Sequence, residues 1–92
     1  MNYGKAIRVV RAVRGLGQRE LAKLIGFSNA YLSQVENGHR EPSLDLLTKV
    51  AEAVGEPLVL IMHLATPIEE LDKMNEEVRN AAGRQLLAFL LG

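Results

Sequence analysis

Residues 18–37 read QRELAKLIGFSNAYLSQVEN, and their spacing is typical of two short helices joined by a tight turn. The fifth residue of this stretch is the small Ala22, and the ninth is Gly26. The fifteenth and eighteenth residues, Leu32 and Val35, are apolar. Two steeply crossing helices need a small side chain at their contact, a turn residue that tolerates a left-handed backbone, and apolar side chains to bury. The stretch meets these requirements and predicts a helix-turn-helix.

Apolar residues recur at helical spacing on both sides of this motif. Residues 3–14 form one such run, which ends before Gly15. A second run lies between Ser43, a typical helix cap, and Gly55, a typical helix end. Together with the two helices of the motif, these runs predict four helices in residues 1–57.

The segment after Pro57 has a different pattern. Residues 58–64 read LVLIMHL, a continuous apolar run that predicts a short buried β-strand. A helix packed within the chain is the alternative. A lone strand leaves backbone groups unpaired, so we expect this one to pair with its own copy in an antiparallel ribbon. The residues expected at that dimer interface are Leu58, Leu60, Met62 and Leu64.

Residues near the C-terminus are typical of one further helix. Thr66, Pro67 and Glu69 form a cap, a first-turn proline and a capping-box acid, which predict a terminal helix over about 67–91. Gly83 predicts a break or a close contact within it. Residues 58–92 are therefore interpreted as a dimerisation extension of strand and helix.

The charges are balanced overall but unevenly distributed. Eleven basic and eleven acidic residues give a net charge of zero, which by itself argues against a nucleic-acid partner. Residues 5–23 nevertheless hold six basic residues and one acidic residue, whereas residues 58–92 hold five acidic and three basic residues. This distribution favours a DNA-facing N-terminal half, with ordinary solvated faces as the alternative.

The composition argues against several other classes of protein. The chain has no cysteine, so it can form neither a disulfide nor a thiolate metal site. His39 and His63 are its only histidines, and neither lies in a metal-ligand or nucleophile–base pattern. We therefore expect no metal, no cofactor and no enzymatic activity. No apolar stretch is long enough to cross a membrane and no signal-peptide layout is present, which predicts a cytoplasmic protein.

Three motifs resemble the phage-repressor-like (Xre/Cro-type) helix-turn-helix DNA-binding family. They are QRELA at 18–22, YLSQVENG at 31–38 and REPS at 40–43, and the resemblance covers about residues 5–57. It implies a lambda-repressor-like bundle of four to five helices that binds operator DNA, usually as a dimer, and regulates transcription. Residues 1–57 are accordingly interpreted as the DNA-binding domain.

The resemblance assigns base reading to the second helix of the motif. Residues opposite its Leu32 and Val35 stripe face outward. Asparagine and glutamine can pair with adenine, serine can donate or accept a hydrogen bond, and an alanine methyl can contact thymine. An ordinary solvated face is the alternative. The expected base contacts are Asn29, Ala30, Ser33 and Gln34.

The flanks of that helix supply the expected phosphate contacts. Gln18 begins the first helix of the motif, where free N–H groups can meet a phosphate, and the family uses this glutamine in that way. Tyr31 is interpreted equally as a packing residue, and His39 as a plain loop residue. The full expected set is Gln18, Arg19, Tyr31, Asn37, His39 and Arg40. The resemblance also implies a structural salt bridge between Arg11 and Glu36.

These observations predict a sequence-specific regulator that binds double-stranded DNA. We expect a homodimeric repressor of a palindromic operator, and its own promoter is one candidate target. The alternative is an antitoxin, in which the same DNA face autoregulates while another surface binds a toxin protein.

Overall fold

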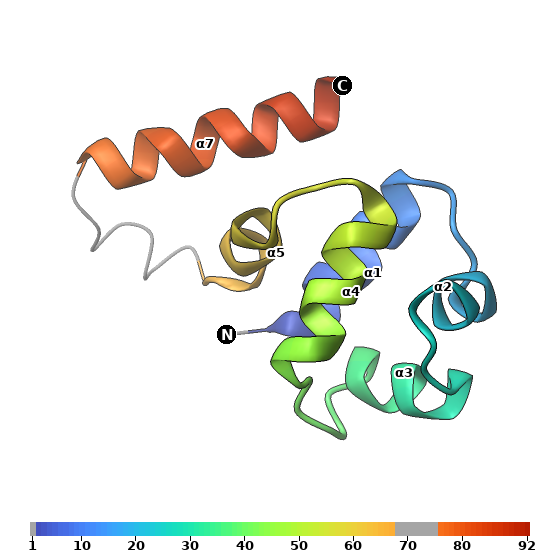
Figure 1. Ribbon diagram of the computed structural model, residues 1–92. Coiled ribbons are helices and arrows are strands. Elements are labelled where there is room, and N and C mark those ends of the chain that lie inside the picture. Colours follow the sequence, from blue (N-terminus) through green and yellow to red (C-terminus); the bar gives the residue numbers. More distant parts are fainter. Residues whose placement is uncertain (1, 68–75) are drawn as a thin grey trace.

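The computed structural model describes residues 2–67 and 76–92, and their regular secondary structure is helical throughout (Figure 1). The helices are α1 (Tyr3–Val13), α2 (Gln18–Ile25), α3 (Asn29–Glu36), α4 (Leu44–Val54), α5 (Leu58–Ala65) and α7 (Glu76–Leu91). The predicted mainly α class is confirmed.

Short-range signals set the ends of α2, α3 and α4. The Ser28 hydroxyl accepts a hydrogen bond from the Tyr31 N–H at 3.0 Å, which satisfies one free donor at the start of α3. Ser43 caps α4 in the same way, at 3.1 Å from the N–H of Leu46. Gly26 ends α2 with φ of 75°, in the left-handed region that the turn before α3 requires. The caps and the turn glycine lie where the sequence predicts them.

One hydrophobic core joins all of these helices. Its members share almost complete burial: Ala6, Ile7 and Val10 of α1; Leu21, Ala22 and Ile25 of α2; Leu32 and Val35 of α3; Leu46, Leu47, Val50, Ala51 and Val54 of α4; Leu60, Ile61 and Ala65 of α5; and Phe89 of α7. Leu32 and Val35 bury one side of α3, which fixes the opposite side toward solvent.

The strand predicted for residues 58–64 is wrong, because these residues form helix α5, the alternative that the apolar run also allowed. Leu60 and Ile61 are buried, whereas Val59 and Met62 are each 40% exposed, a pattern that follows a helix rather than a two-residue alternation. A helix satisfies its backbone groups within itself and needs no second strand. The predicted antiparallel ribbon, with Leu58, Leu60, Met62 and Leu64 at its interface, is therefore not formed.

Helix α5 is part of the same core as the motif. It packs against α1, α4 and α7, and the N–H of Asn2 donates to the carbonyl of Ala65 at 2.7 Å. Packing thus continues across residue 57, where the sequence suggested a domain boundary. Leu60, which is 1% exposed, lies inside this core and is not available to a second copy.

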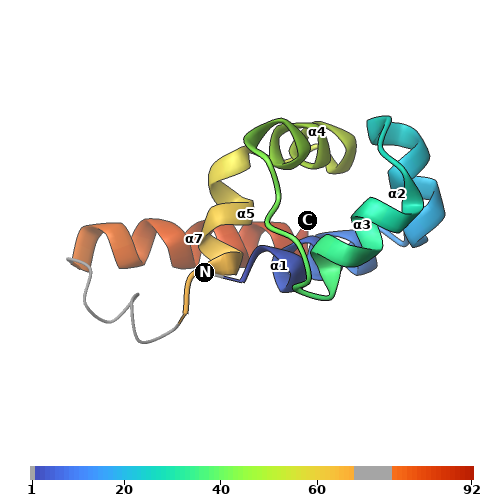
Figure 2. The same ribbon diagram turned by 90° about the horizontal axis from the view of Figure 1, so that it is seen from below.

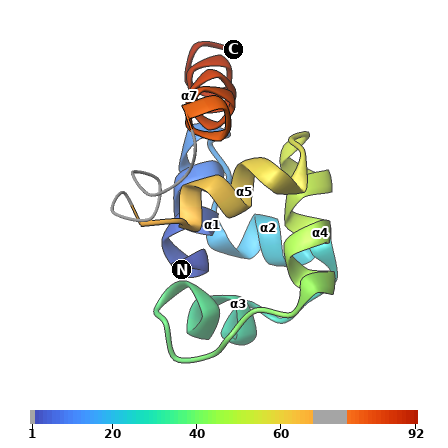
Figure 3. The same ribbon diagram turned by 90° about the vertical axis from the view of Figure 1, so that its left-hand side faces the viewer.

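Helix α7 lies on the opposite end of the molecule from α3 (Figures 1 and 3), and Figure 2 shows it extending past α5. Phe89 is 3% exposed and lies 5.1 Å below the guanidinium of Arg14. The expected break at Gly83 is wrong, because α7 continues through this residue and a Cβ there would meet nothing within 4 Å. Residue 67, where the terminal helix is predicted to start, is not helical, and residues 68–75 lie outside the described residues.

Substitutions on α5 distinguish the helix from a strand. Leu60→Ala should lower the free energy of unfolding by about 2–5 kcal/mol, because it removes a fully buried side chain. Met62→Ala, the control on the same helix, should cost about 0.5 kcal/mol or less, because the side chain is partly exposed. Urea unfolding measures both. Equal losses at the two positions would contradict the helical assignment, since a buried strand places both residues on one face.

Candidate nucleic-acid interface

The outer face of α3 is polar and accessible. Ala30 and Gln34 are exposed, while Asn29 and Ser33 are half-buried. The turn at Gly26 holds the helix at one end, so these side chains project from a fixed frame. The structure therefore brings the four residues expected to read bases onto one accessible side of one helix.

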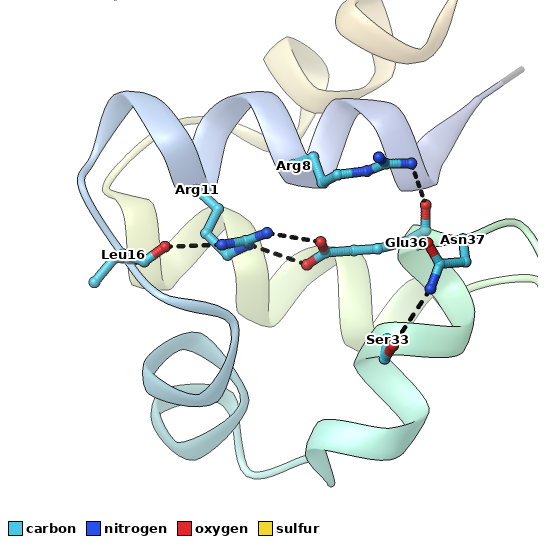
Figure 4. Close-up of polar contacts among 6 residues, drawn as sticks. All are labelled: Arg8, Arg11, Leu16, Ser33, Glu36 and Asn37. Atoms are coloured by element: carbon cyan, nitrogen blue, oxygen red, sulfur yellow. Dashed lines mark hydrogen bonds and ion pairs between the residues drawn. The ribbon is translucent and has the colours of Figure 1, made fainter.

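The hydrogen-bonding capacity of this face differs from residue to residue. Asn29 Oδ1 is buried and has no partner in the described part of the chain, so one end of its amide faces inward. Bidentate pairing with adenine needs both the oxygen and the nitrogen, and Asn29 must therefore rotate before it can make such a contact. Ser33 Oγ accepts from Asn37 Nδ2 at 3.4 Å (Figure 4). Gln34 is exposed and is the side chain best placed for bidentate pairing.

The residues expected to contact phosphate lie at two separate places. Gln18 and Arg19 begin α2, where the N–H of Gly17 is already bound to Glu20 Oε1 at 3.0 Å. Asn37, His39 and Arg40 follow the end of α3 and are exposed. One group thus lies on the helix that precedes α3, and the other in the loop that follows it.

Tyr31 is a packing residue in this structure. Its ring stacks on Phe27, with centroids 5.6 Å apart, and the guanidinium of Arg40 lies 5.3 Å from the ring centroid. Its hydroxyl donates to the carbonyl of Glu41 at 3.5 Å. Cation–π attraction of this kind holds an arginine in place while its N–H groups remain able to donate. Tyr31 thus supports Arg40, the loop residue expected to contact phosphate.

An ion pair joins α1 to the end of α3. Arg11 donates from Nη2 to Glu36 Oε1 at 2.9 Å and from Nε to Glu36 Oε2 at 3.1 Å (Figure 4). The Glu36 side chain is 2% exposed and that of Arg11 is 20% exposed. A third bond runs from Arg11 Nη1 to the carbonyl of Leu16 at 3.1 Å. One arginine thus connects α1, the loop before α2, and α3.

Two further residues of α1 contact the end of α3 and were missed from the sequence. Arg8 Nη2 donates to the carbonyl of Glu36 at 2.8 Å, and Gly4 lies against the backbone of Val35 and Glu36. Gly4, Arg8 and Arg11 are spaced four and three residues apart, as one helix face requires. That spacing was the available signal, but it does not name the partner.

The described residues give little support to a metal site or a membrane span. Within 2–67 and 76–92, no three histidine, cysteine, aspartate or glutamate side chains are grouped to hold a metal ion. Among the helices of the same ranges, none has the length and apolar character needed to cross a membrane. The polar face of α3 and its flanking cations remain the strongest candidate site.

Comparison with known proteins identifies the family. A family model described as helix-turn-helix matches residues 7–61. The chain belongs to this helix-turn-helix family. The match spans α2 and α3 and extends into α5, which agrees with the core that joins these helices.

Individual relatives of this helix-turn-helix protein are regulators of transcription by name. It is 47% identical over 51 residues to an uncharacterized HTH-type transcriptional regulator of Mycobacterium tuberculosis, covering 55% of this chain and 36% of that protein. It is 36% identical over 70 residues to the immunity repressor protein of Bacillus phage phi105, covering 76% and 49%. The chain thus spans half or less of the length of these two relatives.

A solved structure shares the fold. The clp gene regulator ClgR from Corynebacterium glutamicum superposes with a TM-score of 0.70 at 32% identity, over 87% of this chain and 85% of that one. The family model and the phage relative confirm the resemblance to the phage-repressor-like group, and the helical bundle that it implied is observed.

Removing Glu36 should destabilise the protein more than removing an exposed acid. Glu36→Ala leaves Arg11 without its partner, and the free energy of unfolding should fall by about 3 kcal/mol. Asp45→Ala removes the exposed pair with Lys49, 3.2 Å apart, and should cost less than about 1 kcal/mol. Chemical denaturation compares the two. If Glu36→Ala is as mild as Asp45→Ala, the ion pair does not hold α1 and α3 together.

Proposed function

We propose that this protein binds double-stranded DNA sequence-specifically and represses transcription, with α3 inserted in the major groove. The observation that carries the proposal is the two-sided character of α3. Its apolar side is locked into the core by Leu32 and Val35, while its outer side presents hydrogen-bonding groups to solvent. An α-helix fits the major groove of B-DNA, where each base pair offers a distinct pattern of donors and acceptors.

Residues on that outer side of α3 read the bases in this proposal. Gln34 supplies a carbonyl oxygen and an amide NH₂, which match the N6 and N7 groups of adenine. Ala30, one turn earlier, offers a methyl group suited to the methyl of thymine. Ser33 contributes a hydroxyl, and Asn29 contributes its amide after rotation. These four side chains can read a short run of adjacent base pairs.

Phosphate contacts fix the register of α3 in the groove. The flanking residues Gln18 and Arg19 meet the backbone on one side, and Asn37, His39 and Arg40 meet it on the other. These positions are exposed or half-buried, so their side chains can reach a phosphate. Local positive charge of this kind supports DNA binding in a chain whose net charge is zero.

Repression follows from occupancy. A protein bound across a promoter excludes the polymerase, and binding at its own promoter makes the regulator limit its own synthesis. The name of the phage phi105 relative, an immunity repressor, supports repression rather than activation. The operator, in this proposal, is a palindrome that two copies read together.

We expect the dimer to form through α7, because residues 58–64 form a helix and not a strand ribbon. Leu87, Leu90 and Leu91 are 58%, 65% and 78% exposed and lie on one face, opposite the buried Phe89. These exposed leucines form an apolar face beside the exposed Arg84, and exposed apolar surface of this kind favours burial against a partner. The occupant that we propose is a second copy of this chain, whose own leucines would cover the face. Since α7 lies away from α3, this contact leaves both recognition helices free (Figure 3).

Titrations with DNA test the base and phosphate assignments against each other. Gln34→Ala should cost about 1–3 kcal/mol at one base pair of each half-site and little at others. Arg40→Ala should weaken binding to all duplexes similarly and reduce the slope of affinity against salt by about 1 per site. Affinities are measured on a tightly bound duplex and its single-base-pair variants. Equal losses on every duplex for Gln34→Ala would refute its role in base reading.

Light scattering after size exclusion tests the dimer. The wild-type protein should elute as a dimer, and the double variant Leu87→Glu with Leu90→Glu as a monomer, because two carboxylates cannot be buried unpaired. Leu44→Glu, at a residue 68% exposed on α4, is the matched control and should remain dimeric. A monomeric wild-type protein would contradict the dimer proposal. A dimer that survives the α7 substitutions places the interface elsewhere.

A further inference from the structure

One face of α1 holds the C-terminal end of α3. Gly4, Arg8 and Arg11 share this face, and each contacts α3 at its last two residues (Figure 4 shows the two arginines). Arg11 binds the carboxylate of Glu36, whereas Arg8 and Gly4 contact backbone. The backbone contacts do not depend on which side chain the end of α3 carries.

Arg8 completes the hydrogen bonding of the last turn of α3. The final four carbonyls of a helix have no partner within it. Here the Ser33 carbonyl accepts from Asn37, that of Gln34 from His39 and Arg40, and that of Val35 from Gly38. These bonds come from the turn that directly follows the helix.

The fourth carbonyl, that of Glu36, is different, because it accepts from a side chain 28 positions earlier in the chain. Arg8 Nη2 lies 2.8 Å from this oxygen, and its positive charge also favours the negative end of the helix dipole. A local turn would move together with α3, whereas Arg8 ties the helix end to a separate element.

Gly4 brings the two backbones together. A Cβ at this position would lie 2.5 Å from the carbonyl oxygen of Val35 and 2.8 Å from that of Glu36. Real Cβ atoms almost never come this close to another heavy atom, and the obstructing atoms are backbone rather than flexible side chain. Any larger residue at position 4 must therefore push the end of α3 away from α1.

We infer that Arg8 and Gly4 are positioning residues for base reading, an inference that rests on the proposed function of α3. They fix the end of the helix that carries Ser33 and Gln34, while Leu32 and Val35 hold its inner side in the core. A helix held in this way enters the groove at one angle, and bidentate contacts require that angle. Loosening one end costs discrimination between sequences more than it costs general affinity.

The test compares Arg8→Gln with Lys5→Gln. Both substitutions remove one exposed positive charge from α1, but only Arg8 bonds to α3 in the described residues. The ratio of affinities for a matched duplex and a single-mismatch duplex should fall about fivefold or more in Arg8→Gln and stay at the wild-type value in Lys5→Gln. Arg8→Lys, which keeps a charged donor, should restore part of the ratio. Circular dichroism verifies that each variant is folded.

The outcomes separate this inference from the proposed function. If the wild-type protein itself does not discriminate, the proposed function fails and the inference fails with it. If the wild type discriminates and Arg8→Gln does so equally well, only the inference is overturned. Arg8→Gln could instead weaken the affinity for all duplexes equally and lower the salt slope by about 1. Arg8 would then be a phosphate contact, and the inference would also be overturned.

A second pair of variants tests Gly4. Gly4→Ala should lower the discrimination ratio as Arg8→Gln does, because its Cβ displaces the end of α3. Gly83→Ala makes the same substitution in a helix where a Cβ meets nothing within 4 Å, and its ratio should be unchanged. An unchanged ratio in Gly4→Ala would contradict the positioning role.

Discussion

The arrangement of the DNA-facing elements depends on the ion pair between Arg11 and Glu36. A carboxylate that is 2% exposed is unfavourable unless its charge and its hydrogen bonds are matched. The bidentate contact with Arg11 matches both, and the geometry of the guanidinium allows little freedom in how α1 and α3 cross. The remaining contact of Arg11, with the carbonyl of Leu16, fixes the loop that leads to α2. One side chain thus sets three elements of the motif relative to each other.

The other helices stabilise the crossing of α1 and α3. Helix α5 packs on α1 and α4 and ties the start of α1 to its own end, through Asn2 and Ala65. Small domains bury a small share of their surface, so the apolar side chains that α5 adds to the core stabilise the motif. Phe89 of α7 extends the same core outward, under Arg14. The DNA-facing surface and the apolar face of α7 consequently occupy different ends of one packed unit (Figure 1).

The sequence predicted what depends on neighbours along the chain. Ser28, Gly26 and Ser43 act within four residues of themselves, so the ends of α2, α3 and α4 followed from local chemistry. The outward face of α3 followed from helical periodicity. Residues 58–64 were mispredicted because a continuous apolar run has no period to separate strand from helix. Only its packing on α1 and α4 shows that the run is a helix.

Contacts between residues far apart in the chain could not be predicted from the sequence. The roles of Gly4 and Arg8 depend on backbone atoms about 30 residues away, and neither residue type specifies such a partner. The Arg11–Glu36 pair is equally distant, and it was anticipated only through the resemblance to a known family. The inward-facing oxygen of Asn29 likewise required the structure, because an exposed helix face is all that periodicity indicates.

Selection from a pool of random-sequence duplexes by the purified protein tests whether α3 reads base pairs. Successive rounds should enrich one defined sequence, arranged as an inverted repeat whose half-sites lie about one turn of DNA apart. A pool that binds the protein yet stays as random as at the start would contradict base reading, because the outer face of α3 would then carry no sequence information.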